Sequence, residues 1–204
     1  MPSTEPVTAL DIAQRYDPAA FAKAISHRDD SALPFDVAAA RSLPLILDTT
    51  VYIDRLKGKL PVSIIALVAD RAVYHSAVAC TEMAISAGIL DPADSRTAAT
   101  VGPIHSVLGK ISSASIIAPS GAAWVEAGLL AGILARTQGL SRPKSGMSAA
   151  EECCQKGRRR QMLHDILIYL TAMERNMLLV SGNTTDMDVL LQIKPSSNVL
   201  LYRR

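Results

Sequence analysis

The sequence predicts a three-layer α/β sandwich with a central, mostly parallel sheet of about five strands, preceded by a helical N-terminal extension. Short aliphatic runs alternate with longer segments of helical periodicity, which is the pattern of βαβ units. Hydrophobic residues make up 49% of the chain and aromatic residues only 4%, so the core must be aliphatic. The 204 residues are enough for one domain with a sizeable core.

The extension is predicted to span residues 1–43 and the α/β domain residues 44–204. Within the extension, Asp17 and Pro18 form a helix-start signal, and good helix formers follow over 19–25. The first strand is expected at 45–48, because this short run after Pro44 is aliphatic on both faces. A short helix is then expected over 50–56, closing near Gly58.

The remaining elements follow from the same alternation of patterns. The clearest helix is 161–176, where Leu163, Ile166, Leu167, Leu170 and Met173 recur at helical spacing. Other helices are expected at 62–70, 77–87, 91–108, 120–135 and 149–155. Further strands are expected at 73–76, 114–118, 177–180 and 198–202, the last at an edge of the sheet.

Charge and cysteine usage exclude several classes of protein. The net charge of +2 is not that of a sequence-independent DNA coat or of an acidic tail protein. Three cysteines, two of them adjacent, make neither a disulfide framework nor a metal knuckle, which is typical of a reducing, cytoplasmic setting. No run approaches the roughly 18 apolar residues of a membrane helix, and the N-terminus lacks the pattern of a signal peptide.

Four acidic residues lie at positions where they could take part in catalysis or bind a metal ion. Asp48 ends the first predicted strand, Glu82 lies on a helix, Asp165 opens an apolar helix, and Asp186 follows the fourth strand. Taken singly, a helix-dipole charge, a turn residue or a solvated face explains each of the last three. Asp48 is different, because a buried strand end is a costly place for a carboxylate that has no partner.

In order, these acids resemble the PIN-domain nucleases, most closely the VapC-type ribonuclease toxins of bacterial toxin–antitoxin pairs. The resemblance rests on LILDTTVYID, CTEMAISAG and HDILIYLTAMERNMLLVSGNTTDMDVL and covers residues 45–202. It implies a PIN-like fold and a catalytic quartet that holds Mg²⁺ or Mn²⁺, made of Asp48, Glu82, Asp165 and Asp186. It also implies that Thr49 and Ser181 are hydroxyl supports and that Asn183 orients the fourth acid. Asp188 is an alternative fourth acid, but the spacing from Asn183 favours Asp186.

Hydrolysis of a phosphodiester gives a reason for such a set. The reaction needs an activated water, in-line geometry and relief of charge on the leaving oxygen, all of which a divalent ion can supply. Mg²⁺ and Mn²⁺ are hard cations that prefer oxygen ligands. Two carboxylates about 4 Å apart repel by about 4 kcal/mol at an effective dielectric near 20. Without a cation, we therefore expect raised carboxyl pKa values in the cleft.

Basic residues just before the predicted helix 161–176 are candidates for binding RNA. Lys156, Arg158, Arg159 and Arg160 directly precede the helix that carries Asp165 and could neutralise phosphates, although a solvated charge run explains them equally well. Aromatic platforms for base stacking are scarce, since Trp124 and the two Phe are expected in the core.

The sequence therefore predicts a metal-dependent endoribonuclease that cuts RNA, paired with an antitoxin as a type II toxin. Homodimerisation is expected from the resemblance alone. The alternative is a PIN-fold module that binds nucleic acid or protein with little or no catalysis. A phosphotransferase of the haloacid dehalogenase type needs Asp-x-Asp, and it is set aside because position 50 is Thr.

The long N-terminal extension departs from compact PIN toxins, so a housekeeping nuclease stays an alternative to a toxin. The extension could pack behind the sheet, extend a dimer interface or cover the cleft.

Overall fold

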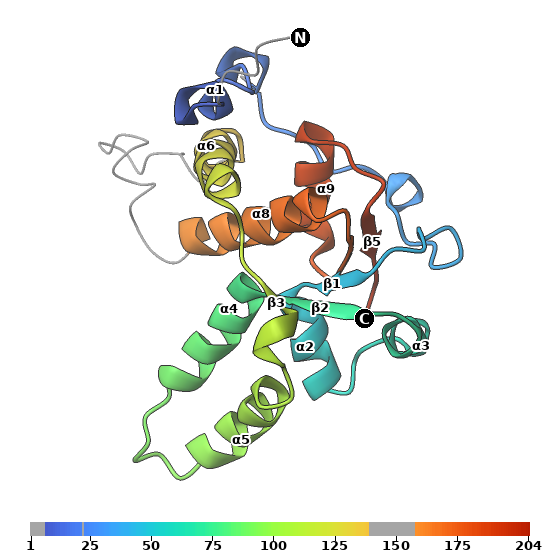
Figure 1. The fold of residues 1–204 in the computed structure, drawn as a ribbon, viewed down its shortest axis with the longest axis vertical. Coiled ribbons are helices and arrows are strands. Elements are labelled where there is room, and N and C mark those ends of the chain that lie inside the picture. Colours follow the sequence, from blue (N-terminus) through green and yellow to red (C-terminus); the bar gives the residue numbers. More distant parts are fainter. Residues whose placement is uncertain (1–6, 22, 139–157) are drawn as a thin grey trace.

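A five-stranded, all-parallel sheet forms the centre of the protein, which confirms the predicted α/β class (Figure 1). The computed structural model describes residues 7–21, 23–138 and 158–204. The strands lie in the order β3-β2-β1-β4-β5, so the direction of strand addition reverses beside β1. Their bounds are β1 Leu45–Leu47, β2 Val73–Ser76, β3 Ile116–Ile117, β4 Leu178–Ser181 and β5 Val199–Leu201.

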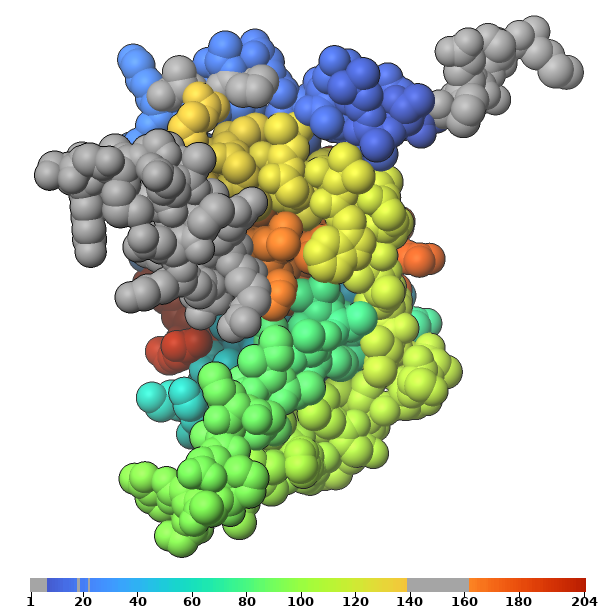
Figure 2. All heavy atoms as spheres, turned by 90° about the vertical axis from the view of Figure 1, so that its left-hand side faces the viewer, coloured from blue at the N-terminus to red at the C-terminus, as the bar shows by residue number. Residues whose placement is uncertain are grey.

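Helices cover both faces of the sheet. Figure 1 shows α6, α8 and α9 on one side and α2, α3 and α5 on the other. Figure 2 shows the α4–α5 hairpin projecting at the end of the molecule opposite the N-terminal residues. None of the helices in the described ranges is both long and apolar enough to cross a bilayer. The helices are α1 Ala9–Ala13, α2 Thr49–Leu56, α3 Val62–Asp70, α4 Ala77–Gly88, α5 Thr97–Leu108, α6 Gly121–Thr137, α8 Arg158–Glu174 and α9 Thr184–Ile193.

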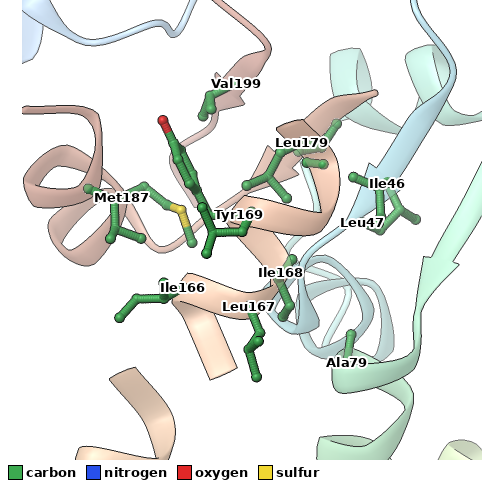
Figure 3. Close-up of a cluster of buried hydrophobic side chains, with 14 of the residues drawn as sticks. Ile46, Leu47, Ala79, Ile166, Leu167, Ile168, Tyr169, Leu179, Met187 and Val199 are labelled. Carbon is green, nitrogen blue, oxygen red and sulfur yellow. The ribbon is translucent and has the colours of Figure 1, made fainter. Parts of the chain in front are cut away.

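The core sits where α8 packs on the two central strands. β1 and β4 are buried along their whole length, as expected for parallel strands covered on both faces. Figure 3 shows Ile166, Leu167 and Ile168 of α8 among side chains from β1, β4 and α9. Tyr169 is also fully buried, and its hydroxyl donates a hydrogen bond to the carbonyl of Lys194. This aliphatic core fixes the strand ends that carry the acids.

Most predicted elements lie within a few residues of the observed ones, and the exceptions have local causes. Only a 3₁₀ turn, Pro18–Phe21, stands where a helix was expected over 19–25. Helix α5 starts at Thr97 rather than 91, because Asp91 and Asp94 accept bonds in successive turns before it. The expectation that Trp124 is in the core is wrong, since it is 50% exposed. The segment 149–155 lies outside the described residues.

The N-terminal segment, residues 7–43 without residue 22, packs against α6, α9 and β5. Arg15 Nη1 lies 2.7 Å from Glu126 Oε2 on α6, and Arg28 Nε lies 2.6 Å from Asp188 Oδ1 on α9. The amide of Leu201 in β5 donates to the carbonyl of Pro34. Residues far apart in sequence are therefore joined by ion pairs between partly exposed arginines and buried acids, and by a backbone hydrogen bond.

The Arg28–Asp188 pair gives a prediction about stability. Asp188 is 1% exposed, and bonds from the side chain and amide of Arg28 lower its pKa although burial alone would raise it. Arg28→Ala should reduce the free energy of unfolding by about 2 kcal/mol at pH 7, because it leaves a buried carboxylate without its cation. A lowered pKa means that this stabilisation is present above the ordinary value of 3.8 and lost below it.

Urea titrations at pH 7 and pH 3 measure this difference, which should shrink at the lower pH. Arg96→Ala is the matched control, because Arg96 pairs with Asp94 on the surface, where ion pairs contribute at most about 0.5 kcal/mol. Equal losses for the two variants at pH 7 would contradict the prediction.

Candidate active site

The candidate site lies at the carboxyl edge of the sheet, between β1 and β4. Asp48 follows β1 directly, and Ser181 ends β4. The two strands are parallel neighbours with Leu47 opposite Val180, so their carboxyl ends meet at one place. This is also where the strand order reverses, and open α/β sheets bind ligands in the crevice at such a switch point.

Asp48 is held rigidly by short hydrogen bonds. Its side chain caps α2 by accepting from the amide of Thr49 at 2.8 Å. Its Oδ2 accepts from the hydroxyls of Thr50 at 2.6 Å and Ser181 at 2.7 Å. The amide of Gly182 donates to Thr50, and a side chain at 182 would collide with the ring of Tyr202. Hydrogen bonds from the start of α2 and from the end of β4 therefore fix this buried carboxylate.

Asn183 links the two acids of α8 and α9. Its amide nitrogen donates to Asp186 Oδ2 at 2.9 Å and to Asp165 Oδ2 at 3.3 Å. Asn183 is also the N-cap of α9, accepting from the amide of Asp186. The segment that follows β4 thus begins a helix and, in the same turn, brings Asp186 beside Asp165.

Glu82, on α4, contacts residues of α2 and of α8. Its Oε2 accepts a hydrogen bond from the hydroxyl of Thr49, and its Oε1 lies 2.9 Å from Nδ1 of His164. Thr49 is therefore a direct neighbour of Glu82. His164 precedes Asp165 on α8, so α8 contributes two adjacent polar side chains to the cleft.

The acids interact through their charges. Burial raises the pKa of Asp165 well above its usual value, and the negative charges of Asp48, Asp186 and Glu82 raise it further. Burial also raises the pKa of Asp48, with a smaller contribution from Glu82, while its three hydrogen bonds act in the opposite direction. The four acids are spread over 139 positions of the sequence, from 48 to 186. In the fold, the charges of the other three act on Asp165.

The other buried acids whose side chains the structure describes have cationic partners. Asp54 pairs with Arg204, Asp188 with Arg28, and Glu126 with both Arg15 and Lys194. Asp48 is buried and Asp165 is partly buried, whereas Asp186 is exposed. Among the side chains that the structure describes, which exclude those of residues 158–161, no Lys or Arg forms a salt bridge with Asp48, Asp165 or Asp186. Buried charges are normally paired or coordinate metals, so Asp48 and Asp165 lack the kind of counter-charge that these side chains supply to the other buried acids.

The donor set suits a hard divalent cation, although the side chains do not form a complete ligand shell by themselves. In the described residues, no group of three or more His, Cys, Asp or Glu is arranged to hold a metal ion. Mg²⁺ commonly binds through one or two carboxylates and keeps several waters, so it does not require such a group. Asp48 and Asp165, whose charges interact, are the two carboxylates that could meet that smaller requirement.

A cavity of about 200 Å³ lies beside this cluster. Asp165 and Asp186 line it together with His27 from the N-terminal segment and Thr185 from α9. His27 Nδ1 lies 3.4 Å from Asp188 Oδ2. The N-terminal segment therefore contributes a wall to the space in front of two of the acids without closing it.

The structure brings most, but not all, of the predicted site residues together. Asp48, Glu82, Asp165, Asp186, Thr49, Ser181 and Asn183 come together, whereas Asp188 lies in the ion pair with Arg28. Lys156 lies outside the described residues, and Arg158, Arg159 and Arg160 form the first turn of α8. The sequence interpretation did not include Thr50 or His164. The Thr-Thr pair after Asp48 and the His next to Asp165 were the available signals.

An all-parallel α/β protein with an acidic cluster at its sheet switch point is the class defined by these features. A scan against protein-family models and a search of curated proteins gave no match. Among solved structures, VapBC2 from Rickettsia felis bound to a DNA fragment from its promoter is similar, with 14% identity and a TM-score of 0.47 over 79% of this chain and 99% of that one. FitAB bound to the IR36 DNA fragment shows 13% identity and a TM-score of 0.46 over 78% and 94%.

The electrostatics of Asp165 give a second prediction. Its pKa is raised, so its contribution to stability is fully present below its ordinary value of 3.8 and is lost as the pH rises through the raised value. Asp165→Asn should therefore make the metal-free protein more stable by about 1 kcal/mol at pH 8 and should have little effect at pH 4.

Chemical unfolding in EDTA at the two pH values measures this. Asp70→Asn is the control, because Asp70 is exposed at the end of α3. A parent protein that is more stable than Asp165→Asn at pH 8 would show that the carboxylate has a counter-charge of its own.

Proposed function

We propose that the chain is a divalent-metal-dependent endoribonuclease that hydrolyses phosphodiester bonds of RNA, and that it acts as the toxin of a type II toxin–antitoxin pair. The observation that carries the catalytic part is that the negative charges of Asp48, Asp186 and Glu82 act on Asp165, while no Lys or Arg among the described side chains pairs with the buried Asp48 or the partly buried Asp165. The order and context of the acids, which resemble those of PIN-domain nucleases, carry the assignment to RNA.

In this proposal Asp48, Asp165, Asp186 and Glu82 hold Mg²⁺ or Mn²⁺. When bound, such an ion activates a water and neutralises charge on the leaving oxygen. Asp48 needs little reorganisation, since its three hydrogen bonds already fix its position. Asn183 sets the position of Asp165 relative to Asp186. The contact of Glu82 with His164 gives a place where a proton can be held, between Oε1 and Nδ1.

The substrate would approach through the space lined by Asp165, Asp186 and His27. Our candidates for contacts with RNA phosphates are the basic residues five to nine positions before Asp165, which are Lys156, Arg158, Arg159 and Arg160. Such contacts are independent of base identity, which suits a chain with few aromatic residues.

An antitoxin partner is supported by apolar side chains on the surface. Ile53 and Leu56 of α2 are 37% and 41% exposed, and Ile89 at the end of α4 is 79% exposed. Ile53 and Leu56 also line a cavity of about 280 Å³ between α2 and the α4–α5 hairpin. An amphipathic helix of a partner protein could bury such residues. A homodimer and a cytoplasmic location complete the proposal and rest on the resemblance and on cysteine usage.

The catalytic proposal predicts a metal effect on both stability and activity. Millimolar Mn²⁺ should raise the melting temperature of the parent by about 5 °C, because the ion binds only the folded state. Asp48→Asn should abolish that shift and reduce cleavage of a generic RNA by about 100-fold or more. Asp70→Asn should match the parent in both measurements.

Two outcomes separate catalysis from a binding role. A thermal shift without any cleavage by the parent would favour the alternative of a metal-binding module that contacts nucleic acid or protein. Cleavage that Asp48→Asn leaves unchanged would remove the proposed active site. Growth arrest on expression, relieved both by Asp48→Asn and by the adjacent open reading frame, would support a toxin over a housekeeping nuclease.

RNA binding gives a separate prediction that does not depend on cleavage. In the Asp48→Asn background, changing Arg158, Arg159 and Arg160 to Gln should weaken binding of single-stranded RNA and reduce the slope of log K against log salt by about 2, the value for three lost phosphate contacts. Lys23→Gln, Arg96→Gln and Arg175→Gln remove the same charge from other surfaces. An equal change in slope for this control set would show a general charge effect and contradict the assignment.

A further inference from the structure

A third cavity lies between α2, α3, β2 and the end of α5 and shares no lining residue with the cavity that Asp165 and Asp186 line. Its volume is about 300 Å³, which is in the range of pockets for small molecules. Aliphatic side chains make up most of its wall. They include Leu47, Val51, Leu60, Val68, Val107 and Ile111. Such a space favours a ligand with an apolar body.

The polar groups of this cavity are donors. Arg55 and Lys110 line it, and both are exposed to solvent on one side. Among the described lining residues none is acidic, and no salt bridge in the described ranges involves Arg55 or Lys110. Two cations at one apolar pocket with no carboxylate in its lining leave positive charge to be matched by a ligand.

His75 is a further polar residue in the lining of this cavity. Tyr52 Oη lies 2.6 Å from His75 Nδ1, and Tyr52 is 5% exposed. We assign the Tyr52 hydroxyl as the donor of this bond, because it has no other acceptor among the described residues, and this assignment places the ring proton on Nε2. Burial lowers the pKa of His75, in agreement with a neutral ring. With this assignment, His75 has one N–H to offer to a ligand.

We propose that this cavity is a binding site for a small apolar carboxylate, with the hydrocarbon body against the aliphatic wall and the carboxylate at Arg55, Lys110 and His75. A cationic or neutral ligand would leave both charges unmatched. A carboxylate accepts several hydrogen bonds at once, which matches a guanidinium, an ammonium and an imidazole N–H. The site is separate from the proposed nuclease centre and does not depend on it.

Octanoate, tested on the full chain by calorimetry and by methyl NMR, is the direct probe. We expect saturable binding, with shifts of the Val68, Val107 and Ile111 methyl groups but not of Leu190, which is buried in α9. Each methylene added between hexanoate and octanoate should tighten binding roughly fourfold. Octylamine should not compete. Competition by octylamine, or shifts confined to other residues, would overturn the proposal.

Variants test the charge and the space separately. Arg55→Met and Lys110→Met should each weaken octanoate binding roughly tenfold, the effect of a lost charge-assisted hydrogen bond. Lys59→Met removes the same charge nearby without touching the lining and should bind as the parent does. Val107→Trp fills the space and should abolish binding with an unchanged far-UV circular dichroism spectrum. Parent-like binding by Arg55→Met and Lys110→Met, or by a folded Val107→Trp, would overturn the assignment.

Discussion

A carboxylate taken out of water needs a counter-charge or enough hydrogen-bond donors, and this requirement governs the placement of acids throughout the fold. Asp54, Glu126 and Asp188 meet it with Arg or Lys, in each case across more than 60 residues of sequence. Asp48 meets part of it with two hydroxyls and an amide. At the carboxyl edge of the sheet, Asp48, Glu82, Asp165 and Asp186 bring charges of one sign together, which is a condition that favours binding of a divalent cation.

The aliphatic core makes this accumulation possible. β1 and β4 are buried on both faces, and α8 packs its fully buried Ile166, Leu167 and Ile168 among them, so the strand ends have little freedom to separate and relieve the repulsion (Figure 3). Packing of many aliphatic side chains outweighs the repulsion among a few carboxylates. The core therefore holds the acidic cluster together although its carboxylates repel one another.

Sequence patterns predict two kinds of feature: the bounds of single helices and strands, and the meeting of residues at strand ends that the sheet topology brings together. The bounds of α3 and β2 follow from their runs, and the meeting of Asp48 with Ser181 follows once the strands are parallel. Helix α9 was missed because SGNTTDMD has the composition of a turn, whereas its Asn183 is a helix cap. The pairing of Arg28 with Asp188, over 160 residues, has no local signal at all. The assignment of Asp186 rather than Asp188 to the metal stays a prediction.

The predicted boundary at residues 43 and 44 divides the sequence by pattern, but physical contacts cross it. Arg28 neutralises Asp188, which lies within one helical turn of Asp186, and His27 beside it lines the cavity that Asp165 and Asp186 share. Without Arg28, the buried carboxylate of Asp188 would lose the cation that compensates its burial. The N-terminal segment therefore does two things at once: it supplies the counter-charge of a buried acid on α9, and it forms part of the wall of the cavity that Asp165 and Asp186 line.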